Sequence, residues 1–259
     1  SAARHLTPVT LELGGKSPTI VHRDANLKLA AKRILSGKML NAGQTCIAPD
    51  HVFVHKDIRA EFEKEMVATL RTFYGDDTIN NPDFGRMINE RHFDRVAALI
   101  GKAKVLIGGQ TDRATKFIAP TILGDVSIND PVMQEEIFGP VLPLLEYSSL
   151  DDLYRQTRSL PNHPLALYLF TSSEEVERDV LANIQFGGGC INNTVMHVAN
   201  AHMPFGGVGE SGMGAYHGKT SFDTFSHARS ILKTSNWLDI PLRYAPYKDR
   251  VEMMRKMVK

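Results

Sequence analysis

The sequence predicts an α/β fold with a mostly parallel sheet and helices on both faces. From Ser17 onward, short apolar runs alternate with longer segments whose apolar residues recur at helical spacing. The composition, 42% hydrophobic and 23% charged over 259 residues, is ordinary for a soluble chain that buries the core of one or two domains. Strands that alternate with helices are typical of parallel sheets covered on both faces.

The strands are expected where apolar residues are dense or alternate with polar ones. Residues 9–13 alternate, and residues 18–21 form a short apolar run. Further strands are expected at 52–54, 105–109, 121–123, 165–170 and 189–192, with another apolar stretch at 141–147.

The helices are expected between these strands. Asp24 or Asn26 can cap the first helix, which runs from about residue 27 to residue 41. Residues 89–101 carry Phe93, Val96 and Ile100 at helical spacing. The remaining helices are expected at 58–74, 150–158 and 174–183.

The two ends of the chain depart from this alternation. Residues 2–6 look like the last turn of a helix, so the strand 9–13 has no earlier partner. After Gly206 a glycine-rich loop is expected as far as residue 218, and a short amphipathic segment follows at 220–229. Residues 230–233 could form an edge strand, and residues 248–259 are expected to form a basic terminal helix.

The charge and cysteine content exclude several classes of function. The formal net charge is +1, which gives no global electrostatic case for binding nucleic acid or an anionic membrane. Two cysteines, Cys46 and Cys190, are too few for a disulfide framework and fit a reducing compartment. There is no run of about 18 apolar residues that could span a membrane. A cytoplasmic enzyme, or part of one, is therefore expected.

Cys46 and Glu12 lie 34 positions apart and together suit acyl chemistry. A thiolate can add to a carbonyl carbon, and a carboxylate can then activate water to hydrolyse the covalent intermediate. Cys46 lies in a loop of small residues after a helix, although a lone cysteine is more often a buried small hydrophobe. Glu12 comes just before Gly14-Gly15, where backbone can approach a ligand, although it could simply pair with Lys16.

Other candidate sites are weaker. No metal site is expected, because His197 and His202 have no carboxylates or cysteines around them at ligand spacing. Gly15-Lys16-Ser17 ends like a phosphate-binding loop but lacks its first glycine. Residues 207–212 match the spacing of a dinucleotide-binding loop but neither follow a clear strand nor lead into a helix. Cys190 is expected to be a buried strand residue.

Four motifs make the chain similar to the aldehyde dehydrogenase superfamily, most closely to its class 3, fatty-aldehyde type. They are LELGGK at 11–16, GQTC at 43–46, EEIFGP at 135–140 and PFGGVGESGMG at 204–214. The resemblance implies that Cys46 is the nucleophile, with its backbone N–H in the oxyanion hole, and that Glu12 is the general base. It also implies that Glu136 binds the nicotinamide ribose of NAD or NADP and that Phe138 packs near the nicotinamide ring.

The resemblance also implies a domain division and a reaction. Residues 1–13 would be the remnant of a largely absent dinucleotide-binding domain, 14–229 the catalytic domain, and 230–259 a C-terminal oligomerisation strand and basic tail. The reaction would be the NAD(P)-dependent oxidation of an aldehyde to a carboxylate through a thiohemiacetal and a thioester. Because the pyrophosphate-binding loop and one oxyanion donor lie upstream in the family, this chain is expected to be inactive alone.

Two alternatives remain open. The chain could be a catalytically silent fragment that persists as a folded or oligomeric module, or an esterase that uses Cys46 without a nucleotide. A homodimer is expected through an edge strand around Ile231-Leu232. The basic tail, with Lys248, Arg255 and Lys259, could lie on a membrane, but a solvated helix is the favoured interpretation.

Overall fold

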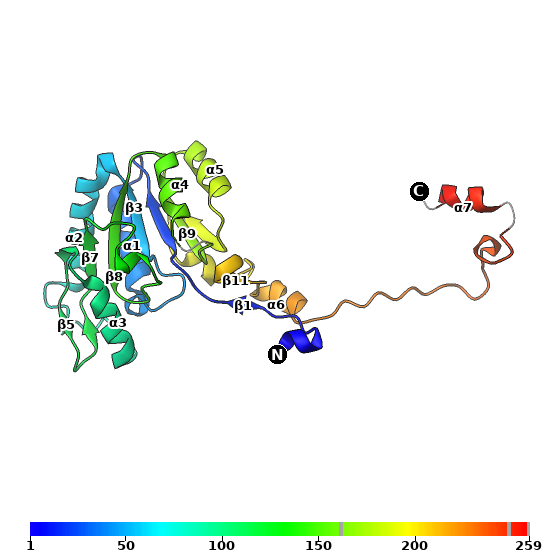
Figure 1. The fold of residues 1–259 in the computed structure, drawn as a ribbon, viewed down its shortest axis with the longest axis horizontal. Coiled ribbons are helices and arrows are strands. Elements are labelled where there is room, and N and C mark those ends of the chain that lie inside the picture. The colour runs from blue at the N-terminus through cyan, green and yellow to red at the C-terminus, as the bar shows by residue number, and fades with distance from the viewer. Residues whose placement is uncertain (161–162, 248–249, 258–259) are drawn as a thin grey trace. The chain divides into compact units, whose positions relative to one another are not determined.

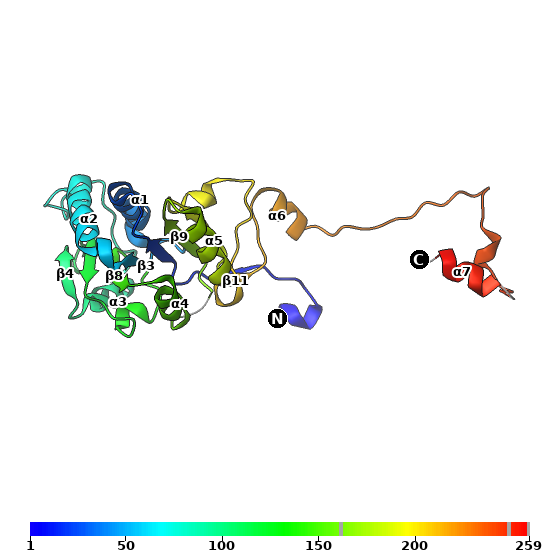
Figure 2. The same ribbon diagram turned by 90° about the horizontal axis from the view of Figure 1, so that it is seen from above.

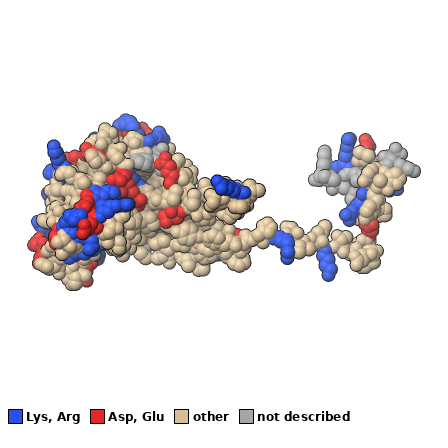
Figure 3. Space-filling view, turned by 60° about the horizontal axis from the view of Figure 1, so that its bottom comes forward, with Lys and Arg blue, Asp and Glu red and all other residues tan. Residues whose placement is uncertain are grey.

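The computed structural model describes residues 1–160, 163–247 and 250–257. The chain divides into a unit Ser1–Phe225, which contains the sheet, and a unit Ser226–Lys259. On the face shown in Figure 3, Lys and Arg side chains of the first unit lie among Asp and Glu side chains.

The first unit is built on a seven-stranded sheet in the order β10-β9-β2-β3-β8-β7-β4 (Figure 1). Every neighbouring pair is parallel except β4 and β7, so the predicted mostly parallel sheet is confirmed. The strands are β2 (Pro18–Val21), β3 (His51–His55), β4 (Lys104–Ile107), β7 (Thr121–Gly124), β8 (Val141–Tyr147), β9 (Ala166–Phe170) and β10 (Gly188–Ile191).

Helices cover both faces of this sheet, as the sequence predicts (Figure 2). Helices α1 (Leu27–Met39) and α2 (Arg59–Tyr74) bury apolar residues in the same core cluster as Val52 and Val54 of β3. Phe53 points to the opposite face, where α3 (Glu90–Ile100), α4 (Leu150–Arg158) and α5 (Glu174–Asn183) pack. The two faces are separate because successive strand residues alternate in direction.

Side-chain caps explain why the helices begin close to the predicted residues. Asn26 caps α1 by accepting a hydrogen bond from the Leu29 N–H at 3.1 Å. Asn89, Ser149 and Ser173 cap α3, α4 and α5 in the same way. The predicted C-terminus of the first helix is wrong, because α1 ends at Met39 and a 3-10 turn, Leu40–Gly43, follows.

The glycine-rich region 206–218 is more ordered than expected. A 3-10 turn, Gly209–Ser211, leads into the short strand β11 (Gly212–Met213), which pairs antiparallel with β1 (Leu11–Glu12). The pairing requires glycine, because a Cβ at position 212 would lie 2.0 Å from the Leu11 carbonyl oxygen. The strand 9–13 thus has a partner, supplied from downstream in the chain. Two further short strands, β5 (Thr111–Asp112) and β6 (Phe117–Ile118), form a hairpin that the sequence did not predict.

The amphipathic segment expected at 220–229 is helical only in its first part. Helix α6 spans Gly218–Thr224 and ends before the second unit begins. The residues that follow, 226–229, carry no helix or strand.

The second unit carries short helical turns and no strand among its described residues. Residues 230–233 have no regular structure, so the edge strand expected there does not form within this single chain. Ile231, Leu232 and Trp237 are highly exposed. Helix α7 covers Val251–Met257, whereas Lys248 and Lys259 of the expected basic helix lie outside the described residues. No helix in the described part of the chain is long and apolar enough to cross a membrane.

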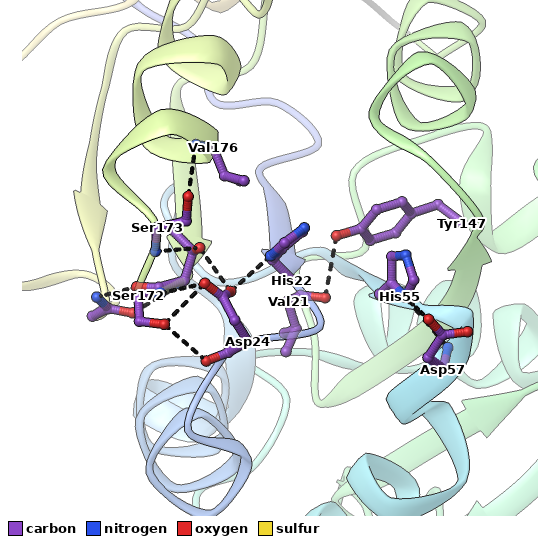
Figure 4. A network of polar contacts seen from close by, with 11 residues as sticks. Val21, His22, Asp24, His55, Asp57, Tyr147, Ser172, Ser173 and Val176 are labelled. Atoms are coloured by element: carbon purple, nitrogen blue, oxygen red, sulfur yellow. Dashed lines mark hydrogen bonds and ion pairs between the residues drawn. The ribbon is translucent and has the colours of Figure 1, made fainter.

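Asp24 organises the carboxyl ends of β2 and β9 (Figure 4). Its carboxylate accepts hydrogen bonds from the Thr171 hydroxyl at 2.8 Å and the Ser172 hydroxyl at 2.9 Å, and it contacts His22 Nδ1 at 2.7 Å. Partial burial raises the pKa of Asp24, but these hydrogen bonds outweigh burial and lower it from 3.8 to about 2. The ionised carboxylate therefore ties the two strand ends together.

The Asp24→Asn variant is expected to lose stability in a pH-dependent way. Because the folded-state pKa of Asp24 is below its unfolded value, its ionic contribution is present above about pH 4 and is lost as the pH falls toward about 2. Denaturant unfolding of both proteins should therefore give a difference in unfolding free energy that shrinks across this window. A difference that stays constant with pH would contradict the assignment.

Candidate active site

Three of the predicted site residues come just before three neighbouring parallel strands. Glu12 precedes β2, Cys46 precedes β3 and Glu136 precedes β8, and these strands lie side by side in the sheet. Because the strands are parallel, the segments that enter them meet at one edge of the sheet. Residues far apart in the sequence are therefore brought together at its amino edge.

Glu12 is held by the pairing of β1 with β11. Glu12 lies opposite Gly212, and the next residue, Leu13, donates its N–H to the Ser211 carbonyl at 3.0 Å. The Glu12 side chain is half-buried, and its Oε1 atom is buried without a hydrogen-bond partner. Glu12 does not form an ion pair with Lys16, because Lys16 Nζ pairs instead with Asp50. The alternative interpretation, in which Glu12 simply pairs with Lys16, is therefore wrong.

Cys46 follows a loop with an unusual backbone. Asn41, Ala42 and Gly43 all have positive φ angles, of 52°, 52° and 75°. This conformation costs roughly 1–2 kcal/mol for each non-glycine residue, and such strain is often found at functional sites. Gln44 supports the loop by donating to the carbonyls of Asn41 and Arg86 and by accepting from the Ile88 N–H at 2.9 Å.

Glu136 lies against the glycines that follow Glu12. A Cβ built at Gly14, whose φ is 85°, would be 2.8 Å from Glu136 Oε2, so only glycine allows this approach. The Cys46 loop approaches the same segment, since a Cβ at Gly43 would lie 2.2 Å from the Gly139 carbonyl oxygen. Phe138, between them, has a φ of 48° and remains 37% exposed. The structure thus brings all four predicted site residues into one region.

The environment of Cys46 disfavours its ionised, thiolate form. Burial, followed by the negative charges of Glu12 and Glu136, raises the pKa of Cys46 to about 11. Burial and the charge of Asp50 raise the pKa of Glu136 to about 7. Cys46 is therefore a neutral thiol at neutral pH, and a neighbouring base must take up its proton before it can attack a carbonyl.

Two residues of this region were not predicted to belong to the site, although Lys16 was considered as a partner of Glu12. Lys16 and Asp50 form a buried ion pair, with Nζ 2.5 Å from Oδ2 and side chains that are 2% and 3% exposed. Lys16 comes four residues after Glu12, and Asp50 four residues after Cys46. Opposite charges just before two apolar strands, at residues 16 and 50, were the signal that could have identified them.

The other sequence candidates lie elsewhere or have structural contacts. Cys190 lies in β10, half-buried, with its Sγ 3.5 Å from His197 Nδ1. In the described residues, no group of three or more His, Cys, Asp or Glu side chains could hold a metal ion. The stretch 207–212 runs into β11, and a Cβ at Gly209 would be 2.8 Å from His163 Nδ1. It therefore lacks the helix that a dinucleotide-binding loop requires.

The fold and these motifs together define a family of α/β proteins, and comparison with known proteins identifies it. A model of the aldehyde dehydrogenase family matches residues 1–231. The chain therefore belongs to the aldehyde dehydrogenase family. Its resemblance to class 3 is confirmed by 47% identity over 252 residues to aldehyde dehydrogenase family 3 member B1 of Homo sapiens.

Other relatives and one solved structure are also aldehyde dehydrogenases to which the chain is similar. The chain is 45% identical over 261 residues to 4,4'-diaponeurosporen-aldehyde dehydrogenase of Staphylococcus aureus, covering 100% of this chain and 57% of that protein. It is 49% identical over 235 residues to the dimeric NADP-preferring aldehyde dehydrogenase of Rattus norvegicus, covering 91% and 52%. The substrate-bound structure of Staphylococcus aureus AldH superposes with a TM-score of 0.96 at 45% identity, covering 100% and 57%. The chain thus spans about half the length of the curated relatives it matches.

The Glu12→Gln variant is expected to make Cys46 more reactive toward iodoacetamide. Removing the Glu12 charge lowers the pKa of Cys46, and each unit of decrease gives about tenfold more thiolate while the thiol remains mostly protonated. The rate should be measured at a fixed pH of about 8, chosen near ordinary thiol pKa values, by mass spectrometry of the Cys46 peptide. Cys190 is the internal control, and an equal increase at both thiols would refute a specific contact between Glu12 and Cys46.

Proposed function

We propose that this chain supplies the catalytic half of an NAD(P)-dependent aldehyde dehydrogenase that converts an aldehyde to a carboxylate. The observation that supports this most directly is the meeting of Glu12, Cys46 and Glu136 at the amino edge of three adjacent parallel strands. A thiol whose pKa is raised by burial and by two neighbouring carboxylates suits nucleophilic catalysis followed by hydrolysis.

In the proposed first step, Cys46 Sγ bonds to the aldehyde carbon and forms a thiohemiacetal. Because the thiol is neutral, its proton must leave as the bond forms, and Glu12 Oε1 is a buried acceptor with no other partner. The backbone N–H of Cys46 would donate to the developing oxyanion. After oxidation to a thioester, Glu12 would pass the thiol proton to solvent and be a carboxylate again. It would then take a proton from water, whose oxygen attacks the acyl carbon and expels the Cys46 thiolate, leaving the carboxylic acid product.

A bound nicotinamide dinucleotide would supply the hydride acceptor for the oxidation. The carboxylate of Glu136, held against the backbone of Gly14, is placed to accept hydrogen bonds from ribose hydroxyls, and the partly exposed Phe138 ring offers an apolar surface to the nicotinamide. Either NAD or NADP would satisfy these contacts. The preference for NADP in the name of the Rattus norvegicus relative belongs to that protein.

The nucleotide-independent esterase is the alternative that one observation favours. Cys46 and Glu12 are both held by contacts within this chain, so acyl transfer from an activated ester needs no further residues to begin. Ester hydrolysis that is lost in Cys46→Ala would separate this activity from a silent folded fragment. Titration calorimetry with NAD would separate both alternatives from a dehydrogenase.

We further propose a cytoplasmic homodimer. Ile231 and Leu232 are 75% and 91% exposed, and an exposed apolar segment of extended chain can pair with a sheet edge. Membrane contact by the basic tail is the less favoured proposal, because the apolar face expected there is short.

The 259-residue chain alone is expected to show no NAD or NADP binding and no aldehyde oxidation. Glu136 and Phe138 would contact only the nicotinamide end of a dinucleotide, whereas most affinity comes from anchoring its remote parts. Calorimetry and absorbance of the reduced nicotinamide test this directly. A longer polypeptide that also contains a nucleotide-binding half should show both nucleotide binding and aldehyde oxidation. Cys46→Ala in that polypeptide should abolish the oxidation. A chain of confirmed mass that reduces NAD with an aldehyde would refute the prediction.

The variant Ile231→Asp/Leu232→Asp is expected to weaken self-association by at least about tenfold, since it places charges in an apolar contact. Analytical ultracentrifugation across micromolar concentrations measures this. Ile240→Asp, exposed in the same unit, is the matched control and should leave the association unchanged. A wild-type chain that is monomeric throughout this range would rule out the proposed contact.

A further inference from the structure

We propose that the buried Lys16–Asp50 ion pair is a positioning pair that holds Glu12, Cys46 and Glu136 in one fixed arrangement. The inference rests on the proposed function of these three residues and adds two residues that act through them.

The ammonium group of Lys16 uses all three of its donors. Nζ donates to Asp50 Oδ2, to the Val132 carbonyl at 3.0 Å and to the Glu135 carbonyl at 2.8 Å. Lys16 lies four residues after Glu12 and two residues before β2, and Glu135 immediately precedes Glu136. One side chain therefore fixes the distance between the Glu12 segment and the Glu136 segment.

The carboxylate of Asp50 makes the complementary contacts. Oδ1 accepts the Ile137 N–H at 2.8 Å, and Oδ2 lies 3.3 Å from His51 Nδ1 as well as accepting from Lys16. Asp50 lies four residues after Cys46 and directly before β3, and Ile137 immediately follows Glu136. The backbone of Glu136 is thus held on one side through Lys16 and on the other through Asp50.

Burial makes this arrangement specific. An ion pair that is almost fully buried gains little net stability over an apolar pair of the same size, but removing one partner leaves an unpaired buried charge. Every polar atom of this pair has a partner, so few other arrangements of the three segments would satisfy both charges. The pair therefore selects one geometry for the site.

The pair also acts on Glu136 through charge. Asp50 raises the pKa of Glu136 and Lys16 lowers it, so the two partners oppose each other. The charged groups that bear on Glu136 come from the strand-entry segments, from α1 and from α3. They are Glu12, Lys16, Lys38, Asp50 and Arg95. The Arg95 guanidinium donates to the Glu136 carbonyl at 3.1 Å. A change in either partner should consequently be detected in the titration of Glu136.

The test compares Asp50→Asn, Lys16→Met and the double variant with Asp24→Asn. Asp24 is the matched control, because it is a hydrogen-bonded carboxylate at the opposite edge of the same sheet. Two measurements by nuclear magnetic resonance are used, the titration of the Glu136 carboxyl carbon and the hydrogen exchange of the Ile137 amide. Glu136→Gln identifies the carboxyl signal. Neither measurement needs a cofactor or turnover.

In Asp50→Asn the Glu136 pKa should fall, because a neighbouring negative charge is removed and the Lys16 charge is left unopposed. In Lys16→Met it should rise, and in the double variant it should return toward the wild-type value. Ile137 amide exchange in Lys16→Met should accelerate at least about tenfold, as expected for local opening at a lost buried contact. Asp24→Asn should change neither measurement.

An unchanged Glu136 titration in both single variants would overturn the proposal. So would an acceleration of Ile137 exchange in Asp24→Asn that equals that in Lys16→Met, because the effect would then be general destabilisation. If a single variant does not fold, the double variant still decides, since a wild-type rate of Ile137 exchange in it would show that the pair holds nothing in place. A longer polypeptide without dehydrogenase activity would refute the proposed function and leave these measurements as they are.

Discussion

The parallel register of β2, β3 and β8 determines where Glu12, Cys46 and Glu136 lie relative to one another. Pro18 lies opposite His51, and Val52 lies opposite Leu144, so the three strands begin near one another. The segments that enter these strands carry Glu12, Cys46 and Glu136. A slip of one residue between two of these strands would invert their buried faces and separate the carboxylates from the thiol.

The placement of the site at the amino edge differs from the usual arrangement in open α/β sheets. Ligands there ordinarily bind at the carboxyl ends of the strands, where the strand order reverses. In this sheet the order reverses between β9 and β2, and the carboxylate of Asp24 already uses the hydroxyl and amide donors at that point. One edge of the sheet is thus closed by structural hydrogen bonds, and the other carries the chemical groups.

The sequence was informative where local chemistry determines structure. The apolar run of β2 and the capping residue Asn26 were found because each carries its own signal within a few residues. The pairing of Leu11 with Met213 and the ion pair of Lys16 with Asp50 were missed, because each depends on contacts between distant segments. The left-handed conformation of Asn41 and Ala42 was also missed, since neither residue requires it and only the surrounding contacts impose it. The candidate site residues were predicted from motifs, whereas their shared electrostatics could be seen only in three dimensions.

The absence of a side chain at Gly43 has a mechanical consequence. The backbone there approaches Gly139 so closely that no gap remains between the loop that carries the thiol and the loop that carries Phe138. Two surfaces in direct contact cannot be displaced toward each other independently. A displacement of the segment that carries Phe138 toward the Cys46 loop would therefore move both segments together.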